Sequence, residues 1–382
     1  MKKYLTIILK RFLKTILGWT GFKTLTQEQT VDFLRPFQVA AFPFHHQPLP
    51  EVADVADASK ILFRPHEAVT YTGFVWQYSG NSPKTGLLRS GNLHTNGTVL
   101  CTDFNTQDAV KDLVRPQPRR QIHHAETLVA PFGHYQDGFA FVGYYDFMML
   151  VAAKLSLIKQ ALPSVDFAEA TIAYPLFDTT YEQEFLAHLG FRPDRILDSR
   201  QHEVKFKQCL LSNNGDWSYP NAANLMALRR QLLRLVDNPD TQHNQRIYIS
   251  RAGRRRVLNE AELITMLMRY GFTIIEDKPR TLAEQATMYN RASLILGPHG
   301  ASFANLVCCQ PKTHLFELFA PGYIPNFFLY LAELMGMTYS GYVPGSITYS
   351  PNWITAENQA EDITVSVSDI EQSLNQYLLT VG

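Results

Sequence analysis

Two short segments in the second half of the chain carry residue types that suit the binding of an anion. Residues 295–305 read ILGPHGASFAN, an apolar strand followed by a glycine turn and then by a helix start at Ala301. Free N–H groups at a helix start favour negative charge, His299 can donate a hydrogen bond to a phosphate oxygen, and Gly300 lets a ligand approach the backbone. We expect a phosphate group here. The plainer interpretation is a glycine turn of the kind that follows strands in any α/β protein.

The second segment is a run of arginines. Residues 251–256, called the arginine loop below, read RAGRRR and follow the β-rich run 247–250. Asn259 suits the N-cap of the next helix, so the loop is short and its positive charge is concentrated. Guanidinium groups bind phosphate oxygens bidentately and need no metal, which suits a diphosphate that gains charge as it leaves. The alternative is a solvated basic loop.

The elements that position these segments follow from hydrophobic periodicity. Strands and helices alternate with short connections, which predicts a parallel sheet in a doubly wound, Rossmann-like domain. Both segments then lie at the carboxyl edge of one sheet, where such proteins bind ligands. Gly271 and Gly336 are expected to end two of the helices. The predicted strands are 246–250, 272–276, 293–296 and 314–318, and the predicted helices are 259–270, 281–292, 301–307 and 325–335.

Two further polar residues fall within this domain. Glu317 lies at the end of the strand 314–318, and its carboxylate either accepts hydrogen bonds from ribose or sugar hydroxyls or is a surface or ion-paired carboxylate. Asn305 lies one helical turn beyond Ala301. It either binds a ligand or, as we favour, braces the phosphate loop.

Length and composition predict two globular domains. The chain has 382 residues, and its hydrophobic content of 46% is enough for two cores. Lys+Arg and Asp+Glu balance at 35 each, which argues against broad nucleic-acid binding. The four cysteines lack metal-binding spacing, and adjacent Cys308 and Cys309 are expected in the core rather than in a disulfide. The histidine pairs 45–46 and 123–124 have no patterned further ligands, so no metal site is predicted.

The first half of the chain is less regular than the second. We expect an N-terminal segment in residues 1–30, an α/β domain with a loop-rich or antiparallel start in residues 31–206, and the Rossmann-like domain in residues 207–382. Residues 205–220 are predicted to be a linker. Strands are predicted at 139–142 and 171–174, and helices at 147–161, 180–189 and 221–236.

Residues 1–17 are basic and amphipathic. A helical wheel mostly separates their lysines and arginine from their apolar residues, so the helix either lies on a membrane surface or packs on the protein itself. Its apolar run is too short to span a bilayer, and no signal-peptide cleavage site follows. We therefore expect a cytoplasmic protein, which in the first alternative is peripheral on the inner face of the membrane.

Several of these segments together resemble the conserved core of glycosyltransferase family 61, which includes plant xylosyltransferases and animal O-linked N-acetylglucosaminyltransferases. They are YISRAGRRRVLNEAEL, Glu284-Gln285, LILGPHGASFANLV and LFELFAP. The resemblance covers residues 246–342 closely and the first half only weakly. It implies a GT-B fold, with two Rossmann-like domains facing a cleft, and an inverting transfer from a nucleotide sugar to a hydroxyl of a glycan, lipid or protein.

The resemblance also assigns roles to the two domains and to single residues. Residues 207–382 would hold the donor, with a UDP-sugar as the expected donor substrate, and residues 31–206 would face the acceptor. The arginine loop is slightly shorter than is usual in the family, so the second diphosphate-binding role, here given to Arg255, is also open to Arg254 and Arg256. The residues expected to bind the donor are Arg251, Arg255, Gly297, His299, Gly300, Ala301, Asn305 and Glu317.

Asp146 is the candidate catalytic residue. Residues 143–147 depart from the family, in which a tyrosine-histidine-aromatic run is followed by an acidic residue four positions after the histidine; here those positions hold Asp146 and Leu150. Asp146 either takes the proton of the acceptor hydroxyl or is the N-cap of the helix that begins at Phe147. The acceptor oxygen would then attack the anomeric carbon from the face opposite the diphosphate, which the arginines and the Ala301 helix start stabilise as it leaves.

Two other classes of protein were weighed against this hypothesis. The chain contains no Asp-x-Asp, so the sequence predicts no metal and no cofactor beyond the donor itself. A nicotinamide-dependent oxidoreductase is disfavoured, because no G-x-G-x-x-G follows a strand with an acidic residue at the expected distance. A pseudo-enzyme that binds a nucleotide sugar or glycan without turnover is the main alternative, since the altered Asp146 segment permits the loss of the base.

Overall fold

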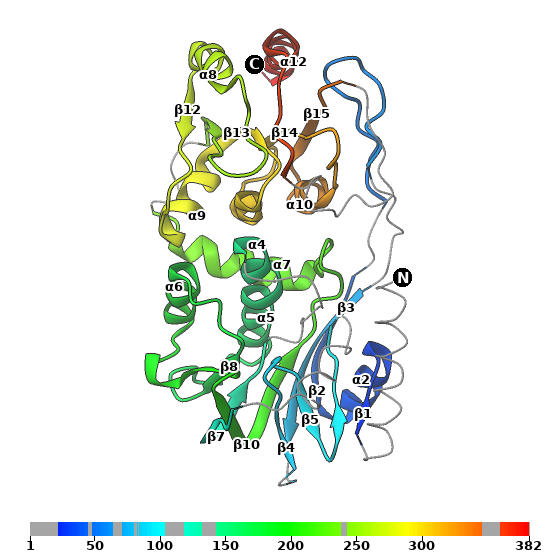
Figure 1. Cartoon of the computed structure of the whole chain (residues 1–382), viewed down its shortest axis with the longest axis vertical. Coiled ribbons are helices and arrows are strands. Elements are labelled where there is room, and N and C mark those ends of the chain that lie inside the picture. Colours follow the sequence, from blue (N-terminus) through cyan, green and yellow to red (C-terminus); the bar gives the residue numbers. More distant parts are fainter. Residues whose placement is uncertain are drawn as a thin grey trace. The chain divides into compact units, whose positions relative to one another are not determined.

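The computed structural model describes residues 22–44, 48–63, 71–79, 82, 84–103, 118–131, 143–237, 243–345 and 360–381. The chain divides into two compact units, which are Met1–His45 with Thr70–Leu228 and His46–Val69 with Arg229–Gly382. Helices accompany β-sheets in both units, so the protein is of the α/β class (Figure 1). The N-terminal segment 1–17, the histidine pair 45–46 and the predicted strand 139–142 lie outside the described residues.

The second unit is built on a five-stranded sheet whose neighbouring strands are all parallel. The strand order is β12-β11-β13-β14-β15. Because β11 and β13 are parallel neighbours, the arginine loop and the turn at His299 leave the sheet at the same edge, as the sequence predicts. The strands are β11 (Gln245–Ile249), β12 (Phe272–Ile275), β13 (Ala292–Pro298), β14 (His314–Leu318) and β15 (Thr338–Tyr342).

The helices of this unit follow the predicted alternation closely. Thr281 caps α9, its hydroxyl accepting from the N–H of Glu284 at 3.2 Å, and Gly271 and Gly336 take positive φ angles just after α8 and α10. The helices are α8 (Glu260–Arg269), α9 (Leu282–Arg291), the 3-10 helix η5 (Ala301–Cys308), α10 (Phe327–Leu334) and α12 (Val367–Val381). Before them come α7 (Ala222–Leu232), within which the two units divide, and η4 (Leu233–Leu235).

Two details of this unit differ from the prediction. The helix at Ala301 is a 3-10 helix, in which side chains three residues apart align, so that Asn305 lies over Ser302 and donates to its carbonyl oxygen at 3.0 Å. Asn259 occupies the N-cap position of α8, but its side-chain oxygen accepts from the N–H of Val365 at 3.0 Å and makes no capping bond. A tertiary contact has therefore replaced the local one.

The core of the second unit lies between its helices and the sheet. Leu263 and Leu267 of α8 share a buried cluster with Leu294 and Leu296 of β13. A spacing of four on a helix and of two on a strand puts each pair on one face, and burial of each leucine contributes about 2 kcal/mol. Residues 48–63 also belong to this unit, where the Asp54 carboxylate accepts from the N–H of Val343 at 2.9 Å.

The first unit contains a six-stranded mixed sheet of order β2-β3-β10-β7-β8-β9. β10, β7, β8 and β9 are parallel to one another, whereas β3 runs antiparallel to β10 and to β2. The antiparallel start that the sequence predicts is confirmed. The strands are β2 (Gln38–Phe44), β3 (Tyr71–Ser79), β7 (Gln121–Val129), β8 (Thr171–Tyr174), β9 (Ile196–Asp198) and β10 (His202–Ser212).

The predicted linker at 205–220 is wrong in its first part. Residues 205–212 form most of β10, which pairs with both β3 and β7. The strand ends in the buried residues Cys209, Leu210 and Leu211, and burial against two neighbouring strands outweighs the turn signal that begins at Asn213.

Shorter elements complete the first unit. A four-stranded sheet of order β1-β6-β5-β4 contains β1 (Lys23–Thr24), β4 (Thr85–Leu87), β5 (Leu93–Thr95) and β6 (Thr98–Val99). The predicted helix 147–161 begins three residues early, as α4, and continues through a π-helical segment. The helices are α2 (Gln27–Leu34), η1 (Arg35–Phe37), α4 (Tyr144–Asp146), η2 (Phe147–Ala152), α5 (Ala153–Ala161), α6 (Thr180–Leu189) and η3 (Pro193–Arg195).

All four cysteines are buried, and for Cys308 and Cys309 this is the position that the sequence predicts. Within the described part of the chain, we find no helix with the length and apolar character needed to cross a membrane.

Candidate functional site

In the second unit, two arginine side chains converge on the backbone carbonyl of His299. Arg251 donates to this oxygen from Nη1 at 2.7 Å, and Arg255 donates from Nε at 2.9 Å. Arg251 leaves the carboxyl end of β11, and His299 leaves the neighbouring β13. The carbonyl therefore fixes two guanidinium groups side by side at the edge of the sheet.

The structure distinguishes the three arginines that the sequence leaves as alternatives. Arg255 is buried, with 6% of its surface exposed, and its guanidinium lies 5.2 Å from the centre of the Tyr323 ring. Arg254 is exposed, and Arg256 is exposed and ion-paired with Asp362 at 2.7 Å. Arg255 also has a left-handed backbone with φ of 58°, a conformation that costs a non-glycine residue about 1 kcal/mol or more. This conformation places Arg255, and neither neighbour, beside Arg251.

Two glycines make room for this arrangement. A Cβ at Gly300 would lie 1.8 Å from Nη1 of Arg251, and a Cβ at Gly297 would lie 3.0 Å from the carbonyl oxygen of Ile249. We expected Gly300 to admit a ligand to the backbone; the structure shows that the space beside it holds the guanidinium of Arg251.

The His299 side chain is enclosed by a carboxylate and by aromatic rings. Its Nδ1 lies 2.5 Å from Oε1 of Glu317, and the hydroxyl of Tyr339 donates to Oε2 of Glu317 at 2.6 Å. Rings of Phe319 and Phe328 lie 5.9 and 4.8 Å from the imidazole. Nδ1 is therefore engaged within the protein, and Nε2 is the ring nitrogen left to meet a ligand.

Glu317 does not lie where a surface carboxylate would. Its side chain is 0% exposed and both of its oxygens have partners, so the surface position considered from the sequence is wrong. In this structure Glu317 holds His299 in place. A direct contact between Glu317 and ribose or a sugar stays a prediction.

Burial shifts the pKa values of the charged groups in this site. It lowers the pKa of Arg251, and together with the charge of Arg251 it lowers the pKa of Arg255 to about 10. Burial raises the pKa of Glu317 to about 8, although Tyr339 and Arg255 favour its ionised form. Burial and then the two arginines lower the pKa of His299 well below its ordinary value. Near pH 7 the histidine and the carboxyl group are both neutral, and the positive charge of the site resides on the arginines.

Ala301 and Asn305 complete the predicted donor-binding set. Ala301 begins η5 directly after Gly300, and the first N–H groups of a helix have no acceptor within the helix. Asn305 is buried and donates to Oε1 of Gln285 at 2.9 Å as well as to Ser302, which agrees with the bracing role that we favoured. All eight predicted donor-binding residues lie in the second unit, near the carboxyl ends of β11, β13 and β14.

Asp146 lies in the first unit, in what we call the Asp146 corner, formed by Gly143, Asp146 and Trp217. Oδ2 accepts from the N–H of Gly143 at 3.1 Å, and Oδ1 accepts from Nε1 of Trp217 at 2.8 Å. Asp146 is the third residue of its helix, whose N-cap is Gly143, so the N-cap alternative for Asp146 is wrong. Both carboxylate oxygens are oriented by hydrogen bonds.

A buried ion pair supports the loop that carries Trp217. Nζ of Lys154 lies 2.7 Å from Oδ2 of Asp103, and both side chains are 0% exposed. The same carboxylate accepts from the N–H of Asn214, and the hydroxyl of Tyr145 donates to the carbonyl of Trp217 at 3.0 Å. Breaking such a pair would leave a charge buried without compensation, which is strongly unfavourable. The pair therefore stays formed, and its carboxylate holds the loop through Asn214.

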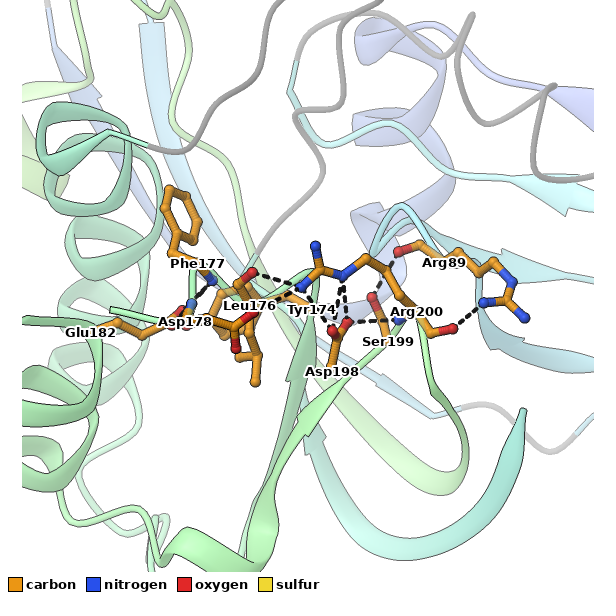
Figure 2. A network of polar contacts seen from close by, with 9 residues as sticks. All are labelled: Arg89, Tyr174, Leu176, Phe177, Asp178, Glu182, Asp198, Ser199 and Arg200. Atoms are coloured by element: carbon orange, nitrogen blue, oxygen red, sulfur yellow. Dashed lines mark hydrogen bonds and ion pairs between the residues drawn. The ribbon is translucent and has the colours of Figure 1, made fainter. Parts of the chain in front are cut away.

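A second network of polar contacts fixes the loop after β8 (Figure 2). Glu182 accepts from the N–H of Phe177 at 3.1 Å and of Asp178 at 2.9 Å. Arg200 pairs with Asp198 at 2.8 Å and donates to the carbonyl of Leu176 at 2.9 Å. The ring of Phe177 contacts the ring of Phe147, the residue directly after Asp146, with 5.6 Å between the ring centres.

A family model matches a stretch of the chain that includes both the arginine loop and Asp146. Residues 132–316 match the model of the family described as Glycosyltransferase 61. The chain belongs to glycosyltransferase family 61. Membership indicates a glycosyltransferase, which in general takes a nucleotide-sugar donor and a glycan acceptor. A search of curated proteins found no match to this sequence.

The structure of this family 61 glycosyltransferase adds residues that the sequence did not single out. Tyr339 lies on β15, which was not predicted, and Tyr323 lies in the loop before α10. Asp277, after β12, accepts from the N–H of Ala252 at 2.9 Å and so holds the arginine loop. Trp217 lies within the predicted linker and was not singled out. The signal that could have identified it is a tryptophan in a polar turn directly after an apolar strand.

Among the residues that the structure describes, no group of three or more His, Cys, Asp or Glu side chains is placed to hold a metal ion.

Proposed function

We propose that this glycosyltransferase is an inverting, metal-independent enzyme of the GT-B type. It moves a sugar from a nucleotide-diphosphate sugar, with UDP as the expected nucleotide, to a hydroxyl of a glycan, lipid or protein acceptor. The observation that carries the proposal is the convergence of Arg251 and Arg255 on the carbonyl of His299. This pair lies at the carboxyl edge of a parallel sheet, the edge at which open α/β sheets bind ligands.

A diphosphate suits this pair of arginines better than a single charge does. Each guanidinium is partly or fully removed from water, and the charge of Arg251 makes that of Arg255 harder to keep, as its lowered pKa shows. An anion placed against both groups would relieve this repulsion. Since the diphosphate gains negative charge as the sugar leaves it, the arginines would bind the transition state more tightly than the donor.

The same argument supports a reaction without a metal. A divalent cation in other glycosyltransferases neutralises the departing diphosphate, and here two fixed guanidinium groups supply positive charge at the proposed position. The sequence also lacks the Asp-x-Asp that would bridge such a cation.

Asp146 is the proposed base. Its two oxygens accept hydrogen bonds from Gly143 and Trp217, which orient the carboxylate. It would accept the proton of the acceptor hydroxyl as the oxygen attacks the anomeric carbon from the face opposite the diphosphate. The configuration at that carbon would invert.

We further propose a role in polysaccharide biosynthesis in the cytoplasm, on the inner face of the membrane. The support is the basic, amphipathic character of residues 1–17, which suits an anionic membrane surface.

The donor site is tested by nucleotide binding. Thermal shift or calorimetry with UDP, GDP, CDP and dTDP identifies the nucleotide, and Arg251→Ala and Arg255→Ala should each weaken its affinity by roughly 10- to 100-fold, the value of a charge-assisted hydrogen bond. Arg256→Ala is the matched control, because this exposed arginine is paired with Asp362. Unchanged affinity in both folded site variants would refute the assignment. Turnover abolished by EDTA and restored by Mg²⁺ or Mn²⁺ would refute metal independence.

A further inference from the structure

A chain of hydrogen bonds leads from Tyr339 through Glu317 to His299. The Tyr339 hydroxyl donates to Oε2 of Glu317 at 2.6 Å, and Oε1 of Glu317 lies 2.5 Å from Nδ1 of His299. The Glu317 side chain is 0% exposed and that of His299 only 5%. A carboxyl group so enclosed, with Tyr339 donating to its other oxygen, controls which nitrogen of the imidazole carries hydrogen.

We propose that Glu317 is a positioning residue that sets the tautomer of His299, so that Nε2 carries the hydrogen offered to the diphosphate of the donor. This inference rests on the proposed function, because a donor anion beside His299 is what gives the tautomer a purpose. Glu317 acts through the imidazole and need not touch the donor, which differs from the ribose contact predicted from the sequence.

The two protonation states of Glu317 have opposite consequences. When the carboxyl group is protonated, Oε1 donates to Nδ1, and a neutral imidazole must then carry its hydrogen on Nε2. When the carboxyl group is ionised, Nδ1 donates to Oε1, and Nε2 presents a lone pair. A phosphate oxygen is an acceptor, so it binds to Nε2 in the first state and is repelled in the second.

Among the titratable groups of this site, Glu317 is the one whose protonation state changes between pH 7 and 9. The titratable groups that face it or His299 are Tyr339 of β15, Tyr323 of the loop before α10, and Arg251 and Arg255 of the arginine loop. Burial raises the pKa of both tyrosines above their ordinary value, and the pKa of Arg255 is about 10. His299 stays neutral because its pKa is lowered, whereas the pKa of Glu317 is about 8.

Nitrogen NMR of the ligand-free protein tests the tautomer without any donor. With ¹⁵N-labelled histidine, the His299 signals are assigned by their loss in His299→Gln. We expect the Nε2–H form at pH 7 and the Nδ1–H form at pH 9. In Glu317→Gln, the amide oxygen accepts from Tyr339 and the amide nitrogen donates to Nδ1, so the Nε2–H form should persist at both pH values. An Nδ1–H form or an imidazolium in the wild type at pH 7 would overturn the proposal.

Tyr339→Phe provides a second variant that keeps the carboxyl group. The Tyr339 hydroxyl favours the ionised form of Glu317, so its removal should move the change of tautomer to a higher pH. A change of tautomer that stays at the wild-type pH would show that Glu317 does not control the ring.

Binding of UDP connects the tautomer to the donor. The terminal phosphate of UDP, with a second pKa of about 6, is fully charged over this range. Affinity should fall roughly 10-fold or more from pH 7 to pH 9 in the wild type and stay level in Glu317→Gln. Glu260→Gln is the matched control, since Glu260 accepts from the Tyr248 hydroxyl at 2.8 Å and should behave like the wild type. Expected tautomers without UDP binding at any pH would refute the UDP site but leave the control of His299 by Glu317 intact. A parallel fall in Glu317→Gln would overturn the proposed link to the donor.

Discussion

The proposed donor site of the second unit and the Asp146 corner of the first unit are held in different ways. In the second unit, Arg251 and His299 each follow closely on one of two neighbouring parallel strands, and the pairing of these strands brings the two residues together. In the first unit, Asp146 is oriented by Trp217, which lies 71 residues further along the chain. The comparison shows that the residues of an anion site can be recognised from short sequence motifs that follow strands. The hydrogen bonds that orient a single carboxylate depend instead on residues far away in the sequence.

The comparison is tested most severely by Asp146→Asn. If the corner performs proton transfer and the second unit binds the donor, this change should lower kcat by roughly 10²- to 10⁴-fold and leave UDP affinity unchanged. The measurement is release of UDP from the donor, with water or an oligosaccharide as acceptor, alongside calorimetry of UDP.

Glu126→Gln serves as the control for Asp146→Asn, because Glu126 is 71% exposed and paired with Lys207. Wild-type turnover in Asp146→Asn would remove the base assignment. A wild-type protein that binds UDP but never releases it from any sugar nucleotide, with suitable acceptors present, would favour the pseudo-enzyme.

The fold of the second unit could be predicted because its signals are local. Each of the four predicted strands is a short apolar run, and glycines at 271 and 336 take the positive φ that ends a helix. β15 was missed because its sequence, TYSGY, is not an apolar run, although two of its residues are buried against neighbouring elements. In the first unit, β10 was taken for a linker because its burial depends on β3 and β7, which lie far away in the sequence.

For the proposed donor site, the sequence indicated which residues to consider but not the contacts between them. Arginine and histidine types pointed to an anion, but the left-handed backbone of Arg255, which selects it over Arg254 and Arg256, has no sequence signal. The burial of Glu317 between His299 and Tyr339 likewise depends on the register of β14 and β15. Local sequence gives the chemistry available, and strand pairing decides which groups meet.

Gly300→Ala sharpens the comparison at the donor site with an intermediate effect. The added Cβ would lie 1.8 Å from Nη1 of Arg251 and 2.8 Å from its Cζ, so the guanidinium must leave the carbonyl of His299. We expect UDP affinity to fall roughly 10-fold or more. Gly253→Ala is the control within the same loop, where a Cβ meets nothing within 4 Å. Equal affinities for the two variants would show that the position of Arg251 does not matter for binding.

The smallest expected effect tests the long-range part of the comparison. Trp217→Phe keeps a ring to pack on Tyr145 but removes the Nε1–H that Asp146 accepts. Loss of one such bond should lower kcat by roughly 2- to 12-fold and leave the KM for the donor unchanged, because Trp217 orients the base and the donor is bound elsewhere.

The deciding measurement is a double-mutant cycle. If Trp217 acts through Asp146, then Trp217→Phe has no further effect on kcat in the Asp146→Asn background, since the carboxylate that it orients is already gone. Additive losses would mean that Trp217 contributes to turnover by another route, and the corner would then have to be described as two independent features.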